Sequence, residues 1–219
     1  LGGEACALSD GARRNIAAHY DLGNDFFATF LDRTRMYSCA IWPRTDATLD
    51  EAAAHKLDLV CDKIGLAAGH TVLEIGTGWG GFALHAAGRY GCRVTTTTIS
   101  TSQYELACER VRAAGLEDRI NVLLEDYRDL RGRYDRLVSI EMIEAVGHRH
   151  LPRFFEVCAN RLARDGAMAL QAILVPEQSW EHSKKSVDFI KRYIFPGGQL
   201  VGHLVALEDV LEGGDPEIE

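Results

Sequence analysis

A short strand-like run that leads into a glycine-rich loop constrains the fold of this chain more than any other feature. Residues 71–75 carry mostly β-branched and apolar side chains, and residues 76–81 read Gly-Thr-Gly-Trp-Gly-Gly. Glycine adopts positive φ angles at low steric cost and allows a ligand to approach the backbone closely. A helix that begins directly after such a loop points its free N–H groups at that ligand. The segment therefore predicts a strand, a ligand-binding turn and a helix, in that order.

The remainder of the chain repeats this order of strand and helix. Short apolar or β-branched runs predict strands, and apolar side chains at helical spacing predict helices. The alternation predicts an α/β, Rossmann-like fold with a mostly parallel sheet and helices on both faces, which binds its ligand beyond the carboxyl ends of the strands. The expected strands cover residues 71–75, 93–99, 120–124, 136–140 and 167–175. The expected helices begin near residue 51 (with Leu57, Val60, Cys61 and Ile64 as its apolar face) and after residue 81, and cover residues 102–114 and 150–162, the last closed by Asp165 and Gly166.

Charge and hydropathy exclude several classes of protein. The 219 residues carry a formal net charge of −8, and broad nucleic-acid binding needs a basic face, so we expect no nucleic-acid partner. The longest apolar run, residues 167–175, is interrupted by Gln171 and falls far short of the roughly 18 residues that a transmembrane helix needs. A local basic patch can still bind a membrane surface.

The cysteines argue against a metal site and a disulfide framework. Six cysteines stand at positions 6, 39, 61, 92, 108 and 158, and none of them forms a Cys-x-x-Cys pair. No His and Cys side chains have zinc spacing, so we expect no metal. Most of the cysteines are expected to be small core residues of a protein in the reducing cytoplasm.

The spacing of the glycines alone fits two cofactors. Gly76, Gly78 and Gly81 match the dinucleotide pattern Gly-x-Gly-x-x-Gly. An NAD site also needs an acidic residue about 20 positions further on, but residues 94–98 read Val-Thr-Thr-Thr-Thr. Glu74, two places before the first glycine, is typical of loops that bind S-adenosylmethionine (SAM). The residues favour SAM over NAD, and a tight turn without a ligand is the remaining alternative.

Seven segments spread over residues 15–200 carry a more specific pattern. They are residues 19–24 (HYDLGN), 36–42 (MYSCAIW), the glycine loop, 98–103 (TISTSQ), 126–130 (DYRDL), 139–147 (SIEMIEAVG) and 188–198 (DFIKRYIFPGG). Together they resemble the cyclopropane fatty acid and mycolic acid cyclopropane synthases. The glycine loop occurs in many methyltransferases, whereas YSCA, EMIEAVG and YIFPGG are far more specific.

The resemblance implies a SAM-dependent methyltransferase fold and a set of cofactor contacts. Thr98, Ser100 and Gln103 are expected to offer neutral hydrogen bonds to the ribose or methionine part of SAM. Asp126 is expected to accept from the adenine amino group, with capping of its own loop as the alternative. The full set of expected SAM contacts is Tyr37, Ser38, Glu74, Gly76, Gly78, Trp79, Gly80, Thr98, Ile99, Ser100, Gln103, Asp126, Tyr127 and Ile140.

The resemblance also implies the catalytic residues Glu144, Cys39 and Gln171. In the family, the residues matching Cys39 and Glu144 help to hold a bicarbonate ion that acts as the base, so bicarbonate is expected beside SAM. Gln171 stands where better-studied relatives carry His, and its amide hydrogens can bind an anion. The alternatives are a helix-capping Glu144, a buried structural Cys39, and a Gln171 that satisfies neighbouring backbone.

The implied reaction is carbon methylation of a lipid double bond. An isolated alkene is a poor nucleophile, so a strong electrophile such as the sulfonium of SAM is needed. Methyl transfer leaves a carbocation, and loss of a proton from the new methyl closes a cyclopropane ring on an unsaturated phospholipid acyl chain. The alternatives are a methyl-branched product or a catalytically weak SAM-binding subunit.

The resemblance divides the chain into three parts. Residues 1–50 are expected to form an arm and lid-like helices over the active site, residues 51–200 the SAM-binding domain, and residues 201–219 an acidic, poorly ordered tail. Four apolar side chains in the first part line an acyl channel or form plain core, and core is favoured. They are Phe26, Phe27, Phe30 and Leu31.

The expected partners follow from the lipid substrate. We expect peripheral contact with the inner membrane surface, on the cytoplasmic side. The family's residues beyond the Pro-Gly-Gly segment have no clear counterpart here, which predicts an acyl channel open on one side. Exposed apolar surface at such a channel favours a homo-oligomer or a partner subunit.

Overall fold

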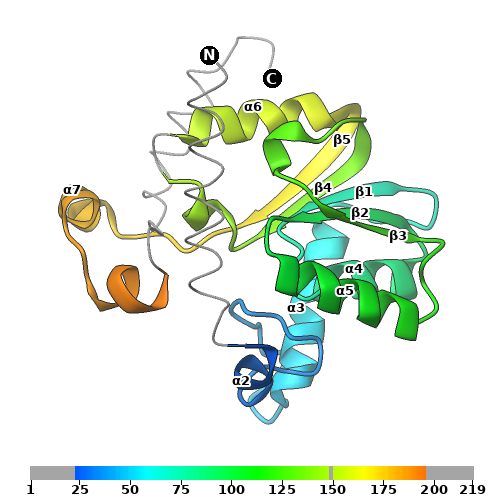
Figure 1. The fold of residues 1–219 in the computed structure, drawn as a ribbon, viewed down its shortest axis with the longest axis horizontal. Helices are drawn as coiled ribbons and strands as arrows, with labels where there is room; N and C mark the ends of the chain where they lie inside the picture. Colours follow the sequence, from blue (N-terminus) through cyan, green and yellow to red (C-terminus); the bar gives the residue numbers. More distant parts are fainter. Residues whose placement is uncertain (1–22, 148–149, 196–219) are drawn as a thin grey trace.

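The computed structural model describes residues 23–147 and 150–195 and has a five-stranded sheet at its centre (Figure 1). The strand order is β3-β2-β1-β4-β5, and all four pairings are parallel. The chain moves outward from β1 to β3 and then returns to the other side of β1, so the switch point lies between β1 and β4. The strands are β1 (Thr71–Ile75), β2 (Arg93–Thr98), β3 (Ile120–Leu124), β4 (Tyr134–Ile140) and β5 (Leu162–Gln171).

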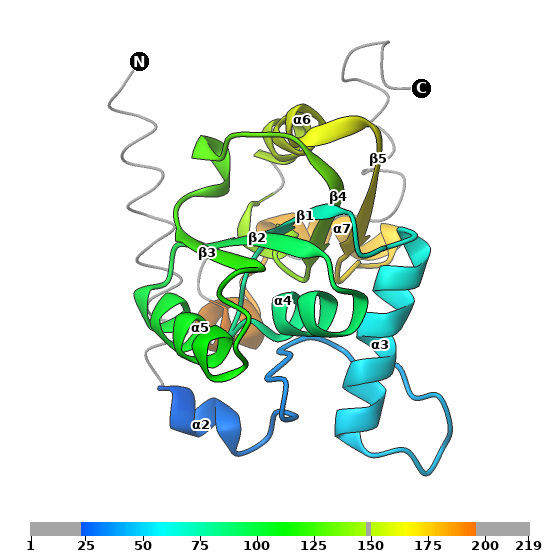
Figure 2. The same cartoon turned by 90° about the vertical axis from the view of Figure 1, so that its right-hand side faces the viewer.

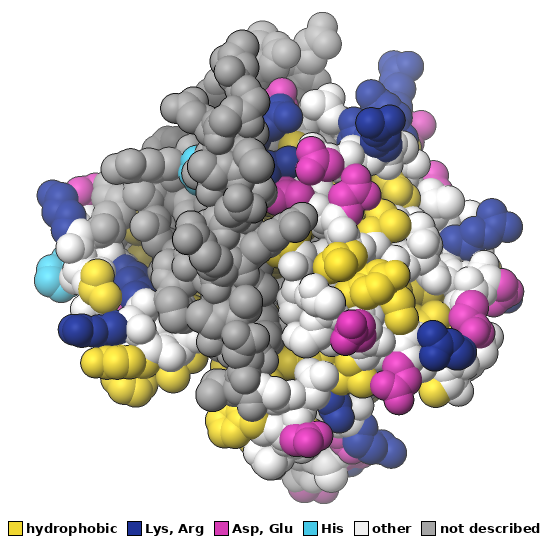
Figure 3. Space-filling view, viewed as in Figure 1, with side chains coloured by type: hydrophobic (Ala, Val, Ile, Leu, Met, Phe, Trp, Pro, Cys, Tyr) yellow, Lys and Arg dark blue, Asp and Glu magenta, His cyan; other side chains and the backbone are white. Residues whose placement is uncertain are grey.

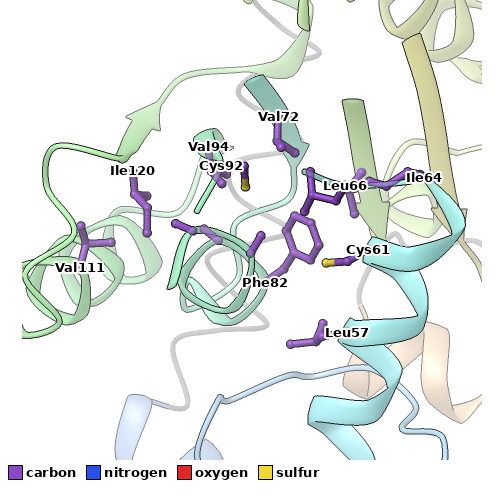
Figure 4. Close-up of a cluster of buried hydrophobic side chains, with 14 residues drawn as sticks. Leu57, Cys61, Ile64, Leu66, Val72, Phe82, Cys92, Val94, Val111 and Ile120 are labelled. Atoms are coloured by element: carbon purple, nitrogen blue, oxygen red, sulfur yellow. The ribbon is translucent and has the colours of Figure 1, made fainter. Parts of the chain in front are cut away.

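Helices cover both faces of the sheet, as predicted. Figure 2 shows α3 (Leu49–Lys63), α4 (Gly81–His85) and α5 (Thr101–Ala113) on one face and α6 (Leu151–Arg161) on the other. Two apolar clusters reflect this division, because successive side chains of a strand point to opposite faces. Val72 of β1 joins Leu57 and Phe82 in one cluster (Figure 4), and the next residue, Leu73, joins Phe154 in the other.

Short elements complete the chain. A π-helical turn, η1 (Ala86–Tyr90), extends α4, and the segment before α3 contains the short helix α2 (Asn24–Ala28). The 3-10 turns η2 (Tyr127–Asp129) and η3 (Ile143–Ala145) follow β3 and β4. After β5 come α7 (Glu177–Lys185) and the π-helical turn η5 (Ile190–Ile194). Within the described ranges, no helix is long and apolar enough to cross a membrane.

Local sequence explains where the two longer helices on the first face begin. Thr48 and Glu51 form a capping box at the start of α3: the Thr48 hydroxyl accepts from the Glu51 N–H, and the Glu51 carboxylate accepts from the Thr48 N–H. Ser100 caps α5 by accepting from the Gln103 N–H. Gly115 follows α5 with a φ of +64°, the left-handed conformation that commonly ends a helix.

The predicted bounds of the last strand were wrong at both ends. β5 begins at Leu162, so Asp165 and Gly166 lie inside it and do not close the preceding helix. Leu162 pairs with Tyr134, the register then shifts, and regular pairing resumes between Ala167 and Arg136. β5 ends at Gln171 and not at residue 175, because its only partner, β4, ends at Ile140, the residue paired with Gln171.

The buried face of α3 also differs from the prediction in one respect. Leu57, Cys61 and Ile64 are buried as expected, but Val60 is only half-buried. Lys56 is buried instead, with 1% of its surface exposed. Of the cysteines, Cys61, Cys92 and Cys158 are buried core residues, as expected, whereas Cys39 is exposed. The expectations for residues 1–22, for the Pro-Gly-Gly segment at 196–198 and for the tail at 201–219 lie outside the described residues.

Candidate active site

The glycine loop lies at the carboxyl end of β1 and has the conformation that its sequence predicts. Gly76, Gly78 and Gly80 have φ angles of +103°, +52° and +82°. The N–H groups of Gly76 and Thr77 donate to the Thr97 carbonyl at 3.1 and 3.0 Å, which fixes the loop against β2. A Cβ on Gly76 would come within 3.0 Å of Met142, but a Cβ on Gly78 would meet no atom of the described residues within 4 Å. The space over Gly78 is therefore open to a ligand, as a SAM loop requires.

Glu74 lies beneath this loop and is 3% exposed. Its Oε2 accepts from the Thr96 hydroxyl at 2.6 Å, and the Thr96 hydroxyl lies 2.7 Å from that of Thr77. Burial raises the pKa of Glu74 to about 8. The carboxyl group thus joins β2 to the loop, and its direct contact with SAM stays a prediction.

Trp79 points away from the open side of the loop and fastens the loop to α2. Its side chain is 1% exposed, and its indole N–H donates to Asn24 Oδ1 at 2.7 Å. The indole ring lies against Phe27 and Tyr37, with centroids 4.9 and 6.5 Å away. Phe27 is therefore core, as favoured, and the Trp79 side chain is placed for packing.

The segment before α3 crosses directly over the start of α4. A Cβ on Gly81 would lie 2.6 Å from Met36 Sδ and 2.7 Å from the Thr34 carbonyl oxygen. Arg110 of α5 reinforces this crossing, because its Nη1 donates to the carbonyl oxygens of Thr34 and Trp79 at 3.1 and 2.5 Å. Close packing at Gly81 therefore brings residues 37–39 to the glycine loop.

The expected SAM contacts after β2 form a polar turn. The Thr98 hydroxyl donates to Gln103 Oε1 at 2.9 Å and accepts from the Ser100 N–H at 3.1 Å. Thr98, Ser100 and Gln103 are all buried, and Ile99 between them is half-buried. The Thr97 carbonyl accepts from the glycine loop, and Thr97 directly precedes this turn. The turn therefore lies beside the loop.

After β3, the structure realises the capping alternative for Asp126. The Asp126 carboxylate caps η2 by accepting from the Arg128 N–H, and it pairs with the Arg128 guanidinium at 2.8 and 2.7 Å. Its adenine contact stays a prediction. Tyr127 packs edge-on against Phe154 at 5.5 Å, and burial raises the Tyr127 pKa to about 12. Ile140, the last residue of β4, is half-buried.

Cys39 and Gln171, two of the expected catalytic residues, lie in contact, and both bond to a carboxylate that the sequence analysis did not assign. The Cys39 N–H donates to Glu141 Oε1 at 3.0 Å. The Gln171 amide Nε2 donates to the same Glu141 oxygen at 2.6 Å and to Cys39 Sγ at 3.2 Å. Burial raises the pKa of the Cys39 thiol, and the negative charge of Glu141 adds to the rise.

Glu144 lies near this group but bonds elsewhere. Its Oε1 accepts from the Ile173 N–H at 2.6 Å, and its Oε2 is buried without a hydrogen-bond partner among the described residues. Burial raises the pKa of Glu144, the Ile173 hydrogen bond opposes the rise, and the charge of Glu141 adds to it. A buried carboxylate oxygen without a partner is costly unless a ligand or substrate uses it.

Lys56 and Glu141 are the two site residues that the sequence analysis missed. Lys56 Nζ donates to the Ser38 hydroxyl at 2.7 Å, and burial lowers the Lys56 pKa against the opposing charges of Glu141, Cys39, Asp32 and Glu74. The sequence could have indicated the burial of Lys56 through its position between Ala53 and Leu57 on the buried side of α3. Glu141 belongs to the specific EMIEAVG segment, yet its role depends on contacts far along the chain.

A shallow apolar groove opens beside Cys39. Its volume is about 350 Å³, and apolar side chains make up most of its walls. Phe30 and Leu31, two of the four candidates for an acyl channel, lie in its wall, whereas Phe27 does not. Met36, Cys39, Trp42 and Leu49 also line the groove. A second depression, of about 260 Å³, lies at the opposite edge of the sheet near Arg93 and carries none of the expected site residues.

A parallel sheet with a glycine loop after β1 is the arrangement of Rossmann-like proteins, the SAM-dependent methyltransferases among them, which bind their cofactor beyond the carboxyl ends of the strands. The comparison with known families is more specific: residues 9–212 match the model of the family described as mycolic acid cyclopropane synthetase. The chain belongs to this family, whose members depend on SAM.

Two curated relatives and one solved structure illustrate the match. Tuberculostearic acid methyltransferase UfaA1 of Mycobacterium tuberculosis is 46% identical over 198 residues, which are 87% of this chain and 46% of the relative. Cyclopropane-fatty-acyl-phospholipid synthase of Escherichia coli K12 is 42% identical over 186 residues, 83% of this chain and 45% of the relative. The chain thus spans about half the length of these relatives.

The solved structure of mycolic acid cyclopropane synthase CmaA1, complexed with SAH and CTAB, has a TM-score of 0.84 and 34% identity. The match covers 92% of this chain and 73% of that one. The predicted family and fold are confirmed, and the cofactor SAM is that of the family. The roles of the individual site residues stay predictions.

Proposed function

We propose that this chain transfers the methyl group of SAM to a double bond of an unsaturated phospholipid acyl chain. One observation carries the proposal: Glu141, Cys39 and Gln171 are joined by hydrogen bonds, with half-buried Glu144 nearby, next to the glycine loop. Met142 provides the link, because it lies between the two glutamates in sequence and its side chain packs against Gly76.

The bound cofactor supplies an electrophilic methyl group, and the protein must control the cation that follows. Positive charge develops on the acyl chain as the alkene reacts, and preorganised carboxylates stabilise such charge far better than water does. Glu141 and Glu144 supply two carboxyl groups at the carboxyl ends of β4 and β5. The site therefore suits the methylation of a carbon that has no lone pair.

The apolar groove beside Cys39 gives an acyl chain a place to lie. It runs from Cys39 past Met36 to Phe30, Trp42 and Leu49. Burial of a methylene group contributes about 0.8 kcal/mol, so a few methylenes in this groove hold a double bond near the polar cluster. A polar metabolite would gain nothing from these walls.

The first candidate product is a cyclopropane ring, which requires loss of a proton from the new methyl group. The relationship to the E. coli synthase supports it, at 42% identity. The second candidate is a methyl-branched product, supported by the 46% identity to a methyltransferase named for tuberculostearic acid. Both products begin with the same methyl transfer.

We also propose peripheral contact with the inner membrane surface through residues around η5. Val187 and Phe189 are 73% and 66% exposed, and Ile190 and Tyr193 are exposed as well. Figure 3 shows hydrophobic side chains gathered at the lower left, over the segment that contains η5. The neighbouring cations of Lys191 and Arg192 suit anionic headgroups. A homo-oligomer or a partner subunit stays a prediction.

Methyl-labelled SAM tests the function directly. The protein is incubated with SAM that carries a trideuterated methyl and with vesicles of mono-unsaturated phospholipid, and the released acyl chains are analysed by mass spectrometry. The expected product gains the labelled carbon with the loss of one deuterium. A saturated methyl branch is two hydrogens heavier than the isomeric ring or methylene branch, and of these two isomers only the methylene branch takes up hydrogen under mild conditions. Label on the headgroup, or no label on any lipid, would contradict the proposal.

A further inference from the structure

Of the residues expected beside a bicarbonate ion, Cys39 and Gln171 are already bonded to a carboxylate of the protein, whereas Glu144 bonds to Ile173. The Cys39 N–H and the Gln171 amide both donate to Glu141 Oε1, at 3.0 and 2.6 Å. A bicarbonate ion would have to displace this carboxylate or lie beside it, and like charges in one site oppose each other. The residues present therefore do not fit a bound bicarbonate.

The backbone of Glu141 is held in an unusual conformation that places its side chain there. Its φ is +47°, and Arg35 is the only other non-glycine residue with a positive φ in the part of the chain that the structure describes. Such a conformation costs on the order of 1–3 kcal/mol and persists where the surroundings impose it, often at functional sites. The bond from the Glu141 N–H to the Gln171 carbonyl, at 2.8 Å, holds it in place.

The surrounding charges suit a carboxylate at this position. The buried Lys56 ammonium faces Glu141 and the Cys39 thiol, and it donates to the Ser38 hydroxyl. Both donors to Glu141 use Oε1, which leaves Oε2 for a proton. Cys39 lines the groove and its N–H donates to Glu141, so a substrate in the groove would lie close to this carboxylate.

We propose that the Glu141 carboxylate, held by Cys39 and Gln171, is the base that removes the proton after methyl transfer, so that the enzyme needs no bicarbonate. This inference rests on the proposed function. It assigns to a side chain the task that the resemblance assigned to an ion.

The proposed step is balanced without a further reactant. The alkene electron pair forms a bond to the methyl carbon while the S–C bond of SAM breaks, and a cation remains on the neighbouring carbon. A C–H bond of the new methyl then breaks; its electron pair closes the ring, and the proton passes to Glu141 Oε2 and on to solvent. For a methylene branch, a hydride first shifts from the methylated carbon to the cation, and the same electron pair forms the double bond.

Two variants test the base role. Glu141→Gln keeps the shape and the acceptor oxygen but loses the basic carboxylate, and Glu141→Gly removes the side chain and vacates the anion site. Glu109→Gln, an exposed change on α5, is the matched control. Turnover is measured in buffer freed of carbon dioxide, with and without added bicarbonate. We expect the wild type to be indifferent to bicarbonate, Glu141→Gln to lose on the order of 10²-fold in turnover, and Glu141→Gly to be rescued by bicarbonate.

A binding measurement gives a readout that does not depend on turnover. The NMR signal of carbon-labelled bicarbonate should broaden with Glu141→Gly and stay sharp with the wild type. Bicarbonate binding to the wild type, a wild-type rate that falls when bicarbonate is removed, or a near-normal rate for Glu141→Gln would each overturn the inference. A wild type that methylates no lipid in either buffer would instead overturn the proposed function, and the base role with it.

Discussion

Lys56 Nζ lies 2.7 Å from the Ser38 hydroxyl oxygen, and this bond joins α3 to the segment that carries Tyr37 and Cys39. The lysine is almost wholly buried, and burial lowers its pKa. A buried ammonium needs opposite charge nearby, and Glu141 and Asp32 supply it. The buried, positively charged Lys56 therefore lies next to the negatively charged groups of the candidate active site.

Lys56→Met should loosen this segment. The variant keeps the length of the side chain but removes its charge and its bond to Ser38, so we expect a loss of about 1–3 kcal/mol in the free energy of unfolding and weaker SAM binding. Lys63→Met, an exposed change on the same helix, should leave both unchanged. Urea unfolding and calorimetric titration with SAM measure the two quantities. Equal stability of the two variants would show that Lys56 merely fills space.

Glu74 should make stability fall as pH rises from 4.5 towards 8. Its pKa is 4.5 in the unfolded chain and about 8 in the folded protein, so between these values the folded state holds a proton that the unfolded state has released. Its contribution to stability is thus fully present below 4.5 and is lost as pH rises through about 8. Urea unfolding across this window should show a steeper fall for the wild type than for Glu74→Gln. The exposed control Glu105→Gln should keep the wild-type slope; parallel curves for wild type and Glu74→Gln would refute the argument.

Glu144→Gln should keep SAM affinity and lose most of the turnover. The carboxylate oxygen Oε2 is buried without a partner among the described residues, and we propose that it acts on the developing cation and not on the cofactor. We expect a loss on the order of 10²-fold in kcat, with SAM binding unchanged in calorimetry. A near-normal rate would show that the carboxylate has only a structural role.

Cys39→Ser should reduce activity only in part. The bond from residue 39 to Glu141 comes from the backbone N–H and survives the substitution, and a hydroxyl can replace the thiol as the acceptor from Gln171. We expect a loss of less than about tenfold in kcat, whereas a nucleophilic cysteine would lose nearly all activity. Steady-state kinetics on a folded, SAM-binding variant decides between these roles.

Gly78→Ala and Gly115→Ala form a matched pair for the cofactor loop. Both glycines have a positive φ, +52° and +64°, and neither has an atom within 4 Å of an added Cβ. Each variant should lose about 1–2 kcal/mol of stability through the strained backbone. Only Gly78→Ala should weaken SAM binding, by about tenfold from a micromolar affinity, which is a binding free energy of roughly −8 kcal/mol. NAD should not compete with SAM for either variant. Equal SAM affinity of the two variants would show that the cofactor does not occupy the space over Gly78.

Local patterns predicted the sheet well and its last strand badly. The bounds of β1 and β3 match the expected ranges 71–75 and 120–124, because each is a short apolar or β-branched run flanked by clear turns. The register shift in β5 depends on how β4 lies beside it, which no property of residues 162–166 reveals. Long-range pairing therefore limited the prediction.

The same limit applies to the candidate site. Cys39 and Gln171 were each assigned to the candidate site, but the carboxylate that lies between them is Glu141, which forms its contacts across more than 100 positions in one case. Lys56 is a charged residue on a buried helix face. A lysine is predicted to be exposed unless the opposite charges that pair with it are known. Positions where a residue departs from the local sequence rule, such as a lysine on a buried helix face, are expected to be functional or strained sites.

The crossing of residues 34–36 over α4 determines how this molecule can open. Separating the segment from the glycine loop requires loss of the close contact at Gly81 and of the bridge that Arg110 makes between the Trp79 carbonyl and the carbonyls of Arg33 and Thr34. Proteins open in such contiguous cooperative units. The amides of the glycine loop and those leading to Cys39 should therefore exchange their hydrogens with solvent at a common rate. A ligand that protects one set should protect the other, so we expect cofactor binding and the ordering of residues 37–39 to be a single event.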